Sequence, residues 1–536
     1  MFNQVLDPMH SVALTAIVAL VPVVLLLVLL AVFRMTAWLA TLIGAAVTLG
    51  LALAVWQVPL SNAVKACLYG SATGVWAVDW ITFWGVIIFN TLTLTGVFGD
   101  FQKWLIAHAT ADVRVQAILL AWAFGALLEG LVGFGYPWAV VAPLLIALGI
   151  RDLDAIRVAA IANNAPVSFG ALGVPIIALA AVTGLPLMAL SASIGKIVAL
   201  LALVPPWVLI YLVAGKRGLR GAWPLAIVGS FAYIAGQLPV SQYLGPYLPD
   251  ISGAVVCFVA LLVLLRYWKP KETLGYGGVP VPEAEASHSK GHGLTRRRVL
   301  AAWAPFFVLV VVVVLWTGPW SPLPGITLAS FKVEGISSLS HKLIHASFGF
   351  KPFIGGTSIM AAWVLIMLEL RPGRSTLRVV FRRTLGQMWG AFLVGVFIFA
   401  LAFIFNYSGM ASSLAYAFSK LGVWFIVVAP ILGWIGVALS GSNTSTNAMF
   451  GAFQAMVGNL LGFPALLAPS LNSVGAEVGK PIAPQTASVG VATTGYVRNE
   501  GEVIRHNMGW TLVLVAVLIC VGLFYYFVFP HAMMLH

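Results

Sequence analysis

The stretch EGLVGFGYP, from Glu129 to Pro137, lies in the middle of a long apolar segment, residues 117–150. It places a carboxyl group, three glycines and a proline where neither a charge nor an interrupted helix is expected to be favourable. An acidic residue at membrane depth is a candidate functional residue, and non-helical backbone there is tolerated only where protein or a water-filled cavity satisfies its polar groups. We therefore predict that this stretch is an irregular, functional part of a membrane protein.

The composition of the whole chain supports a membrane location. Of its 536 residues, 61% are hydrophobic and only 8% are charged, and the mean hydropathy is +1.01. Repeated apolar runs of about 18 or more residues identify helices that span a bilayer. We expect a single integral membrane domain over residues 1–536. The first run, 11–33, is longer than a signal-peptide core, so we expect it to be a retained span.

The distribution of basic residues predicts the orientation of the chain. The formal net charge is +13, with 29 Lys and Arg residues. If Arg34 is cytoplasmic, alternating the predicted spans places most of these residues inside, including Arg498 and Arg505, as the positive-inside rule requires. Both termini are then external, in the cell inner membrane, and the charge is explained without a nucleic-acid partner. Binding of anionic lipid by the basic run 371–383 is an alternative use of that segment.

The first half of the chain, residues 1–215, contains two interrupted apolar segments. Three predicted spans come first, at about 12–33, 38–57 and 74–97. The segment 116–150 is too short for two crossings and has cytoplasmic-type charges at both ends, so a re-entrant hairpin fits it better. The span 157–182 is broken by polar residues, glycines and prolines, and a span at about 187–214 completes the half. The interrupting residues are Asn163, Asn164, Ala165, Pro166, Gly170, Gly173 and Pro175.

The second half, residues 299–536, repeats this order. A linking region, 216–298, precedes it, with two spans at about 223–240 and 250–266 and a polar cytoplasmic loop, 267–298. Three spans then lead to a second hairpin, a second broken helix and a last span. The spans are at about 299–317, 356–370, 385–405 and 508–529, the hairpin is 423–462 and the broken helix is 464–495.

The two halves are therefore predicted to be inverted-topology repeats. Five crossings in the first half invert the orientation of the second, and the two linking spans preserve the inversion; many secondary transporters are built in this way. The expected fold is all-α, with about 12 transmembrane helices, two re-entrant hairpins and two discontinuous helices in one transporter domain.

The interrupted segments offer the chemistry of an anion site. Half-helix N-termini that meet near the midplane favour an anionic group, and the side chains offered there are mainly Asn, Ser, Thr and Gln. Such groups suit a small carboxylate that also carries a hydroxyl group. No Arg lies within the predicted spans, so a bidentate guanidinium clamp is not available. Lys480 is the cation among the motifs.

Each of these residues also has a structural interpretation. Ser and Thr in apolar helices bond back to their own backbone, and Gly marks close packing of helices. Lys480 either binds substrate or pairs with Glu477, three residues earlier on a helix. Glu129 either carries a coupled proton, because an apolar site favours the neutral form of a carboxyl group, or caps a hairpin turn. Asp79 has three tryptophans close by in sequence, and we expect it to anchor at the membrane interface.

Several functional classes are not supported by the sequence. It has no Walker loop, no Cys/His spacing typical of a metal site and no Ser-His-Asp context, and its three cysteines are scattered. We therefore expect a protein that is not an enzyme and that has no cofactor and no metal.

Several long motifs, in order along the chain, resemble those of the lactate permease family. In the first half these are the stretch 129–137 and NNAPVSFGALGVPI, residues 163–176. In the second half they are NYSG at 406–409, GSNTSTNA at 441–448 and GKPIAPQ at 479–485. The similarity covers nearly the whole chain. One departure is Asn443, because some members of the family have Asp at this position.

The resemblance implies import of L-lactate, D-lactate or glycolate, which are 2-hydroxy monocarboxylates, in symport with protons across the bacterial inner membrane. It implies that Glu129 is the proton site. The substrate ligands that it implies are Asn163, Asn164, Ser442, Thr444, Ser445, Lys480 and Gln485. The backbone positions that shape the hairpins and broken helices are Gly130, Gly133, Gly135, Pro166, Gly170, Gly173, Gly441 and Gly479.

Two alternatives stay open at this point. The string Ser442-Asn443-Thr444 also resembles the hairpin motif of sodium-coupled dicarboxylate symporters. The first alternative is therefore a sodium- or proton-coupled carrier of another carboxylate, such as gluconate or a dicarboxylate. A channel for small anions, which conducts only downhill, is the other.

Overall fold

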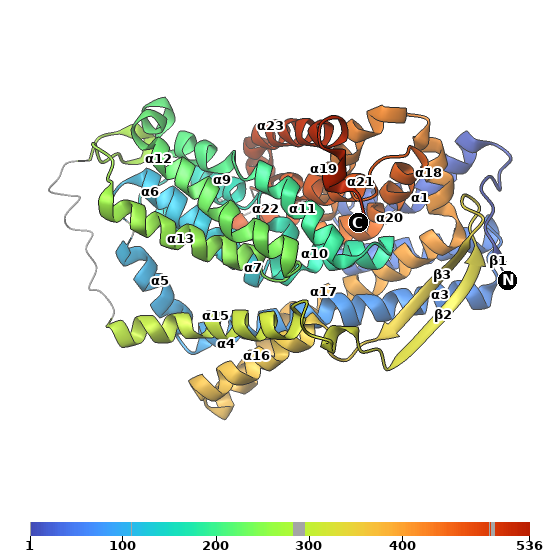
Figure 1. Ribbon diagram of the computed structural model, residues 1–536, viewed down its shortest axis with the longest axis horizontal. Coiled ribbons are helices and arrows are strands. Elements are labelled where there is room, and N and C mark those ends of the chain that lie inside the picture. The colour runs from blue at the N-terminus through green and yellow to red at the C-terminus, as the bar shows by residue number, and fades with distance from the viewer. Residues whose placement is uncertain are drawn as a thin grey trace.

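The computed structural model describes residues 2–108, 110–133, 135–281, 295–492, 494 and 499–535. Some positions named above lie outside the described residues: Phe134 in the first hairpin motif, the middle of the loop 267–298, residues 493 and 495 at the end of the predicted second broken helix, and Arg498. The described chain is mostly helical, and most of its helices run along the long axis of the molecule (Figure 1).

The helical elements follow the apolar segments of the sequence. In the first half and the linking region they are α1 (Val12–Ala31), α2 (Ala37–Ala54), α3 (Leu60–Thr73), the π-helix η1 (Gly74–Asp79), α4 (Trp80–Leu94), α5 (Val97–His108), α6 (Val113–Gln116), the π-helix η2 (Ala117–Phe124), α7 (Gly125–Leu131), α8 (Tyr136–Ala147), α9 (Asp152–Ala162), the 3-10 helix η3 (Val167–Phe169), α10 (Gly170–Thr183), α11 (Leu187–Leu201), α12 (Pro205–Tyr243), α13 (Pro249–Tyr267) and the 3-10 helix η4 (Tyr276–Gly278). In the second half they are α15 (Arg296–Thr317), η5 (Leu323–Gly325), α16 (Gly355–Leu370), α17 (Arg374–Ser408), α18 (Met410–Ser419), η6 (Gly422–Trp424), α19 (Phe425–Ser440), α20 (Asn443–Leu460), α21 (Leu467–Gly479), η7 (Lys480–Ile482), α22 (Pro484–Val491), α23 (Glu500–Phe527) and η8 (Pro530–Met533).

Ten helices of the described chain are long and apolar enough to cross a membrane, or eleven if the bent pair Asp152–Ala162 and Val167–Thr183 counts as one span. The sequence predicts about twelve. One source of the difference is Leu187–Tyr243, which counts once although it has 57 residues and leaves helical geometry at Gly215 and Ala222. It is long enough for two crossings at about 1.5 Å per residue. The structure supports a polytopic membrane protein, and the number of spans stays a prediction.

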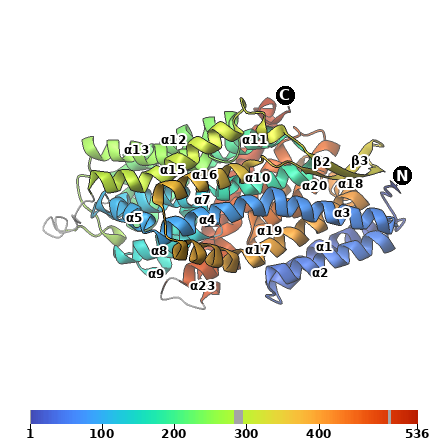
Figure 2. The same ribbon diagram turned by 90° about the horizontal axis from the view of Figure 1, so that it is seen from below.

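The third predicted span, 74–97, begins earlier in the structure. α3, η1 and α4 form one continuous helical segment, Leu60–Leu94, which crosses the view of Figure 2 as a blue ribbon. Its first turns contain Ser61, Asn62 and Lys65, so they lack the apolar run that marks a span in the sequence. The π-helix in its middle is a local distortion of a kind that occurs often at functional sites.

A small sheet corrects the all-α prediction. β2 (Ala329–Ile336) and β3 (Leu343–Phe350) form an antiparallel hairpin, and β1 (Phe2–Asn3) pairs in parallel with the end of β2. Both strands of the hairpin contain several aromatic and β-branched residues, which favour extended structure. The sheet and the N-terminus lie at the end of the molecule opposite to the start of α15 (Figure 1).

Both predicted hairpins form two helical arms joined by a turn. In the first, Val113–Leu131 leads to a turn in which Gly133 and Gly135 have φ angles of +65° and +79°, and α8 follows. In the second, α19 and α20 are joined at Gly441 and Ser442. The arm Val113–Leu131 is by itself long enough to cross a membrane, so its re-entrant course stays a prediction.

Both predicted broken helices contain breaks at Gly, Pro and Asn residues. The first bends by 68° between α9 and the segment that contains α10, and Ala171, Leu172 and Gly173 adopt left-handed backbone there. The second passes from α21 through the short 3-10 helix η7 to α22. The inverted relation between the two halves stays a prediction.

The hairpins and broken helices, which we call the interrupted helices, pack against one another across the two halves. α10 contacts α20, and α21 contacts α11, α19 and α20. A second group, α2, α3, η1, α4 and α17, packs beside them, and we call it the α17 wall. Within it, a Cβ at Gly70 or Gly74 would lie 2.3 Å or 2.4 Å from a backbone oxygen of α17. These glycines therefore allow α3 and η1 to approach α17 closely.

Candidate functional site

A cavity of about 540 Å³ lies between the interrupted helices and the α17 wall. All four interrupted segments contribute to it. The residues that they supply are Glu129, Gly133, Val167, Gly170, Ala171, Val174, Pro175, Ser440, Gly441, Ser442, Asn443, Thr444, Ser445, Lys480, Gln485, Thr486 and Val489. Segments that are far apart in the sequence thus meet around one cavity.

The α17 wall and the residue before α2 supply the other side of the cavity. The residues are Thr36, Ala37, Trp38, Val78, Asp79, Thr82, Gln387, Trp389, Gly390, Ala391, Val394, Gly395, Ile398 and Phe399. Trp389 is 57% exposed, and Thr36 and Gln387 are also exposed. The cavity therefore reaches the molecular surface at this end of the wall.

Lys480 and Glu129 form a buried ion pair on the side of the interrupted helices. Lys480 Nζ lies 2.7 Å from Glu129 Oε1, and the two side chains are 8% and 2% exposed. Asn163 Nδ2 donates a hydrogen bond to the other oxygen, Glu129 Oε2, at 3.1 Å. The ion pair connects the first hairpin with the second broken helix and places one group of each charge at the cavity.

The pairing of Lys480 with Glu477 that the sequence allows is wrong. α21 ends at Gly479, so Lys480 lies beyond the last regular turn, and its side chain is directed to Glu129. Glu477 Oε2 accepts a hydrogen bond from the backbone N–H of Ser168, at 3.0 Å. Glu477 is fully buried and joins the second broken helix to the first.

The proposed substrate ligands fall into two groups. Those that line the cavity are Ser442, Thr444, Ser445, Lys480 and Gln485. Asn163 lies behind the lining residues, where its side chain donates a hydrogen bond to Glu129. Asn164 is buried outside the lining, and its amide atoms have no hydrogen-bond partner within the described part of the chain. Ser442 also caps α20, because its Oγ accepts a hydrogen bond from the backbone N–H of Ser445 at 3.2 Å.

Helix N-termini face the cavity from the interrupted helices. α20 begins at Asn443 and α22 at Pro484, and the first turns of both helices contribute lining residues. The first N–H groups of a helix have no partner within it, and the N-terminus carries a partial positive charge. Together with Lys480, these termini make this side of the cavity favourable for a carboxylate.

A layer of buried amide and hydroxyl groups lies behind the cavity. Asn447 Nδ2 donates hydrogen bonds to the carbonyl of Pro175, at 2.9 Å, and to Ser473 Oγ, at 3.0 Å. Asn472 Nδ2 donates to Asn447 Oδ1 at 2.9 Å, and Gln454 Nε2 donates to Asn472 Oδ1 at 2.9 Å. Because this network joins α10, α20 and α21, it fixes the interrupted helices relative to one another.

The glycines of the motifs allow close contacts around the ion pair. A Cβ at Gly170 would lie 2.5 Å from Glu129 Oε1. A Cβ at Gly173, where φ is +79°, would lie 2.4 Å from the carbonyl oxygen of Pro246. Gly130 and Gly479 are packed as tightly, and Pro166 lies in the break between α9 and η3. Larger side chains at these positions would separate the segments that form the site.

The chain is similar to known proteins over almost its full length. Among solved structures, it resembles the Alcanivorax borkumensis YdaH transporter with a TM-score of 0.46 and 15% identity, over 92% of this chain and 97% of that chain. It is 34% identical over 553 residues to the glycolate permease GlcA of Escherichia coli (strain K12), with 98% of both chains covered. It is 30% identical over 536 residues to the L-lactate permease of the same strain, with 96% of this chain and 97% of the relative covered. A family model described as L-lactate permease matches residues 15–529.

The chain belongs to the L-lactate permease family. Its relatives are named permeases, so it is a membrane transport protein and not an enzyme.

One cavity residue of this permease was missed by the sequence analysis. Asp79 is only 5% exposed and lines the cavity, so its carboxyl group is buried within the protein, and its place at the membrane interface stays a prediction. The tryptophans around it pack on one another, with the rings of Trp76 and Trp80 stacked 5.2 Å apart. The signal that identifies Glu129, an acidic residue within an apolar run, was also present here.

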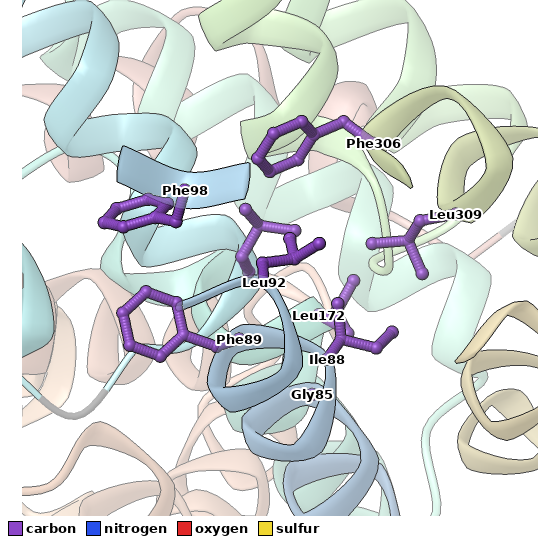
Figure 3. Close-up of a pocket in the computed structure, with 9 residues that line it drawn as sticks. Gly85, Ile88, Phe89, Leu92, Phe98, Leu172, Phe306 and Leu309 are labelled. Atoms are coloured by element: carbon purple, nitrogen blue, oxygen red, sulfur yellow. The ribbon is translucent and has the colours of Figure 1, made fainter. Parts of the chain in front are cut away.

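A second cavity of this permease is much smaller and apolar. It has a volume of about 10 Å³ and lies between α4, α5 and α15, where Phe89, Phe98 and Phe306 point towards it (Figure 3). Its lining side chains carry no charged or hydrogen-bonding group. The 540 Å³ cavity contains the charged and polar side chains of the motifs and is the candidate substrate site.

Proposed function

We propose that this permease is a proton-coupled symporter that imports a small 2-hydroxy monocarboxylate, lactate or glycolate, across the cell inner membrane. The observation that carries the proposal is the ion pair between Lys480 and Glu129 on the side of a cavity that helix N-termini face. The relatives named glycolate permease and L-lactate permease support this substrate class.

A 2-hydroxy acid has two groups that match this side of the cavity. Its carboxylate fits at Lys480 and at the N-terminus of α20, where both the charge and the N–H groups favour an anion. Its hydroxyl group donates and accepts hydrogen bonds. The side chains of Thr444 and Gln485 have no hydrogen-bond partner among the described residues and line the cavity, so they are available to it.

The ion pair supplies the proton coupling in this proposal. The substrate carboxylate and the Glu129 carboxylate compete for Lys480. When Glu129 takes up a proton it releases Lys480, which then pairs with the substrate. Binding the anion while Glu129 stays ionised leaves a buried charge without a partner, at a cost of about 3–5 kcal/mol. Substrate and proton are therefore bound together.

The two sides of the cavity have different roles in the proposed movement. The interrupted helices carry Glu129, Lys480 and the polar ligands, and the α17 wall consists of continuous helical segments. In our proposal the interrupted helices move as a unit past the α17 wall and open the cavity to each side of the membrane in turn. The open end at Trp389 lies close in sequence to Arg383, which the positive-inside rule assigns to the cytoplasm. With external termini, the structure is then the state open to the cytoplasm.

The test is uptake of labelled L-lactate into proteoliposomes that contain the purified permease. We expect accumulation above equilibrium with an inward proton gradient in the absence of sodium. Unlabelled glycolate and D-lactate should compete, and succinate and gluconate should not.

Three results would contradict the proposal. A requirement for a sodium gradient would favour sodium coupling. Competition by succinate or gluconate would favour a carrier of another carboxylate. Downhill flux alone, without exchange of labelled for unlabelled lactate, would indicate an anion channel.

A further inference from the structure

Asp79 is an acidic residue of the cavity that takes no part in the exchange of ligands at Lys480. It ends the π-helix η1 in the α17 wall, opposite the interrupted helices, and lines the cavity. Gly395 of α17 lies directly against its carboxyl group, because a Cβ at that glycine would lie 2.3 Å from Asp79 Oδ2. The absence of a side chain at Gly395 therefore makes room for the carboxyl group.

Among the described residues, no counter-charge lies close to Asp79. Its Oδ2 is buried and has no hydrogen-bond partner within the described chain. The elements packed against η1 are α3, α4, α10 and α17. α4 and α10 contain no titratable residue. The carboxyl group therefore faces only uncharged side chains and backbone from these two helices.

The titratable residues of α3 and α17 lie far along their axes. Along the helices, at 1.5 Å per residue, those of α3 lie about 15 Å or more from Asp79, and those of α17 lie about 15 Å or more from Gly395. These residues are Lys65, Cys67 and Tyr69 in α3, and Arg374, Arg378, Arg382, Arg383 and Tyr407 in α17. Lys351, whose carbonyl accepts a hydrogen bond from Trp76 Nε1, has an exposed side chain. On the cavity surface, the charged groups are Glu129 and Lys480, which pair with each other.

A carboxyl group that is buried without a counter-charge is stable in its neutral form. When the interrupted helices pass along the α17 wall, an ionised Asp79 would lose its remaining hydration and gain no partner. We propose that Asp79 is a second proton-binding site of the permease, and that the interrupted helices cross the α17 wall only while Asp79 holds a proton. This inference rests on the proposed function, since it takes the cavity as the transport site.

The two acidic residues then have separable effects on transport. Glu129 competes with the substrate for Lys480, so its ionisation lowers the apparent affinity for substrate. Asp79 does not contact Lys480, so its ionisation slows the crossing itself in both directions. The pH dependence of KM therefore reports on Glu129, and the pH dependence of the maximal rate reports on Asp79.

The experiment is exchange of labelled for unlabelled lactate across proteoliposomes with equal pH on both sides, measured over a range of lactate concentrations and pH values. For the wild type, we expect the maximal rate to fall by about tenfold for each pH unit above the point where Asp79 ionises. Asp79→Asn, which has the same shape and is always neutral, should keep its maximal rate at alkaline pH while its KM still rises with pH. Asp79→Glu should again show a rate that falls with pH.

Asp250→Asn is the matched control. Asp250 is as buried as Asp79, its Oδ1 accepts a hydrogen bond from the hydroxyl group of Tyr233 at 2.9 Å, and it does not line the cavity. The maximal rate of this variant should keep the wild-type dependence on pH.

Several results would overturn the inference. They are a wild-type maximal rate that does not change with pH, an Asp79→Asn variant that is inactive at every pH or keeps the wild-type profile, and an Asp250→Asn variant whose profile becomes flat. Failure of the proposed function would be a different result, because the wild type would then show no lactate exchange in the absence of sodium.

Discussion

Glu129 and Lys480 lie 2.7 Å apart in a buried part of the chain, so removing either one leaves the other without a counter-charge. Breaking a buried ion pair in this way costs about 3–5 kcal/mol, whereas replacing both partners by uncharged residues is often close to neutral. At the scale of the residue, this difference separates the contribution of the pair to stability from its role in transport.

Lys480→Met is therefore expected to lower the free energy of unfolding in detergent by about 3–5 kcal/mol, and the double variant Glu129→Gln with Lys480→Met should recover most of that loss. Thermal unfolding of the purified variants measures both effects. Lys332→Met is the matched control, because Lys332 pairs with Glu334 at the same distance on the surface, and we expect a loss of about 0–1 kcal/mol. Equal stability of Lys480→Met and the wild type would show that the pair does not persist.

Glu129→Gln should make substrate binding independent of proton uptake. With no carboxylate competing for Lys480, lactate affinity should no longer fall as pH rises, and accumulation driven by a proton gradient should drop below that of the wild type. Equilibrium binding at several pH values and uptake into proteoliposomes measure the two effects. Glu334→Gln, at a half-buried acidic residue of β2 outside the cavity, should leave both unchanged. Full uphill accumulation by Glu129→Gln would remove Glu129 from the coupling.

Single residues of the site could be predicted, but their partners could not. Glu129 and Lys480 stand out because each is a charge among apolar, Gly- and Pro-rich motifs. Their contact joins residues that are 351 apart and lie on different elements, and one sequence contains no signal for such a pairing. The spacing of Glu477 and Lys480 suggested a local pair instead, which the end of α21 prevents.

At the scale of the element, the shape of the first broken helix depends on a tight left-handed turn. Gly173 has a positive φ and its missing Cβ leaves room for the carbonyl of Pro246. Gly173→Ala is expected to destabilise the permease by about 2–4 kcal/mol, because overpacking costs about 1–3 kcal/mol and left-handed backbone about 1–2 kcal/mol for a residue with a Cβ. Transport should fall as well, since the turn borders the cavity. Thermal unfolding and lactate exchange measure the two effects.

Gly184→Ala is the control for this variant. Gly184 also has a positive φ, +71°, at the end of α10, but a Cβ there would meet no atom within 4 Å. Only the backbone term of about 1–2 kcal/mol applies, and transport should be close to that of the wild type. If both variants lose the same free energy of unfolding, close packing at Gly173 does not stabilise the break in the helix.

The breaks in the helices could be predicted because Gly, Pro and Asn interrupt apolar runs, and those residues oppose regular helix locally. The hairpin β2–β3 was not predicted: its strands contain residues that favour extended structure, but its register depends on pairing Ala329 with Phe350 across the hairpin. The start of the Leu60–Leu94 helix was also missed, since Lys65 and its polar neighbours hide the helix in a search for apolar runs.

At the scale of the whole molecule, the cavity reaches the molecular surface near the exposed Trp389 of α17, and the sheet lies at the end of the molecule with the N-terminus (Figure 1). In a variant whose three cysteines are replaced by serine, Trp389→Cys should react with a membrane-impermeant maleimide from the cytoplasmic side, and Lys332→Cys in β2 should react from the external side. Labelling of inside-out and right-side-out vesicles distinguishes the two. The opposite pattern would reverse the orientation taken from the basic residues.

The central claim is that a substrate carboxylate replaces Glu129 at Lys480 and that Glu129 takes up a proton as it leaves. The most direct measurement is the number of protons taken up when lactate binds to the purified permease, obtained by calorimetry in buffers with different enthalpies of ionisation. We predict uptake of about one proton for each lactate bound by the wild type and none by Glu129→Gln. Lactate binding by the wild type without proton uptake, or the same uptake by Glu129→Gln, would contradict the claim.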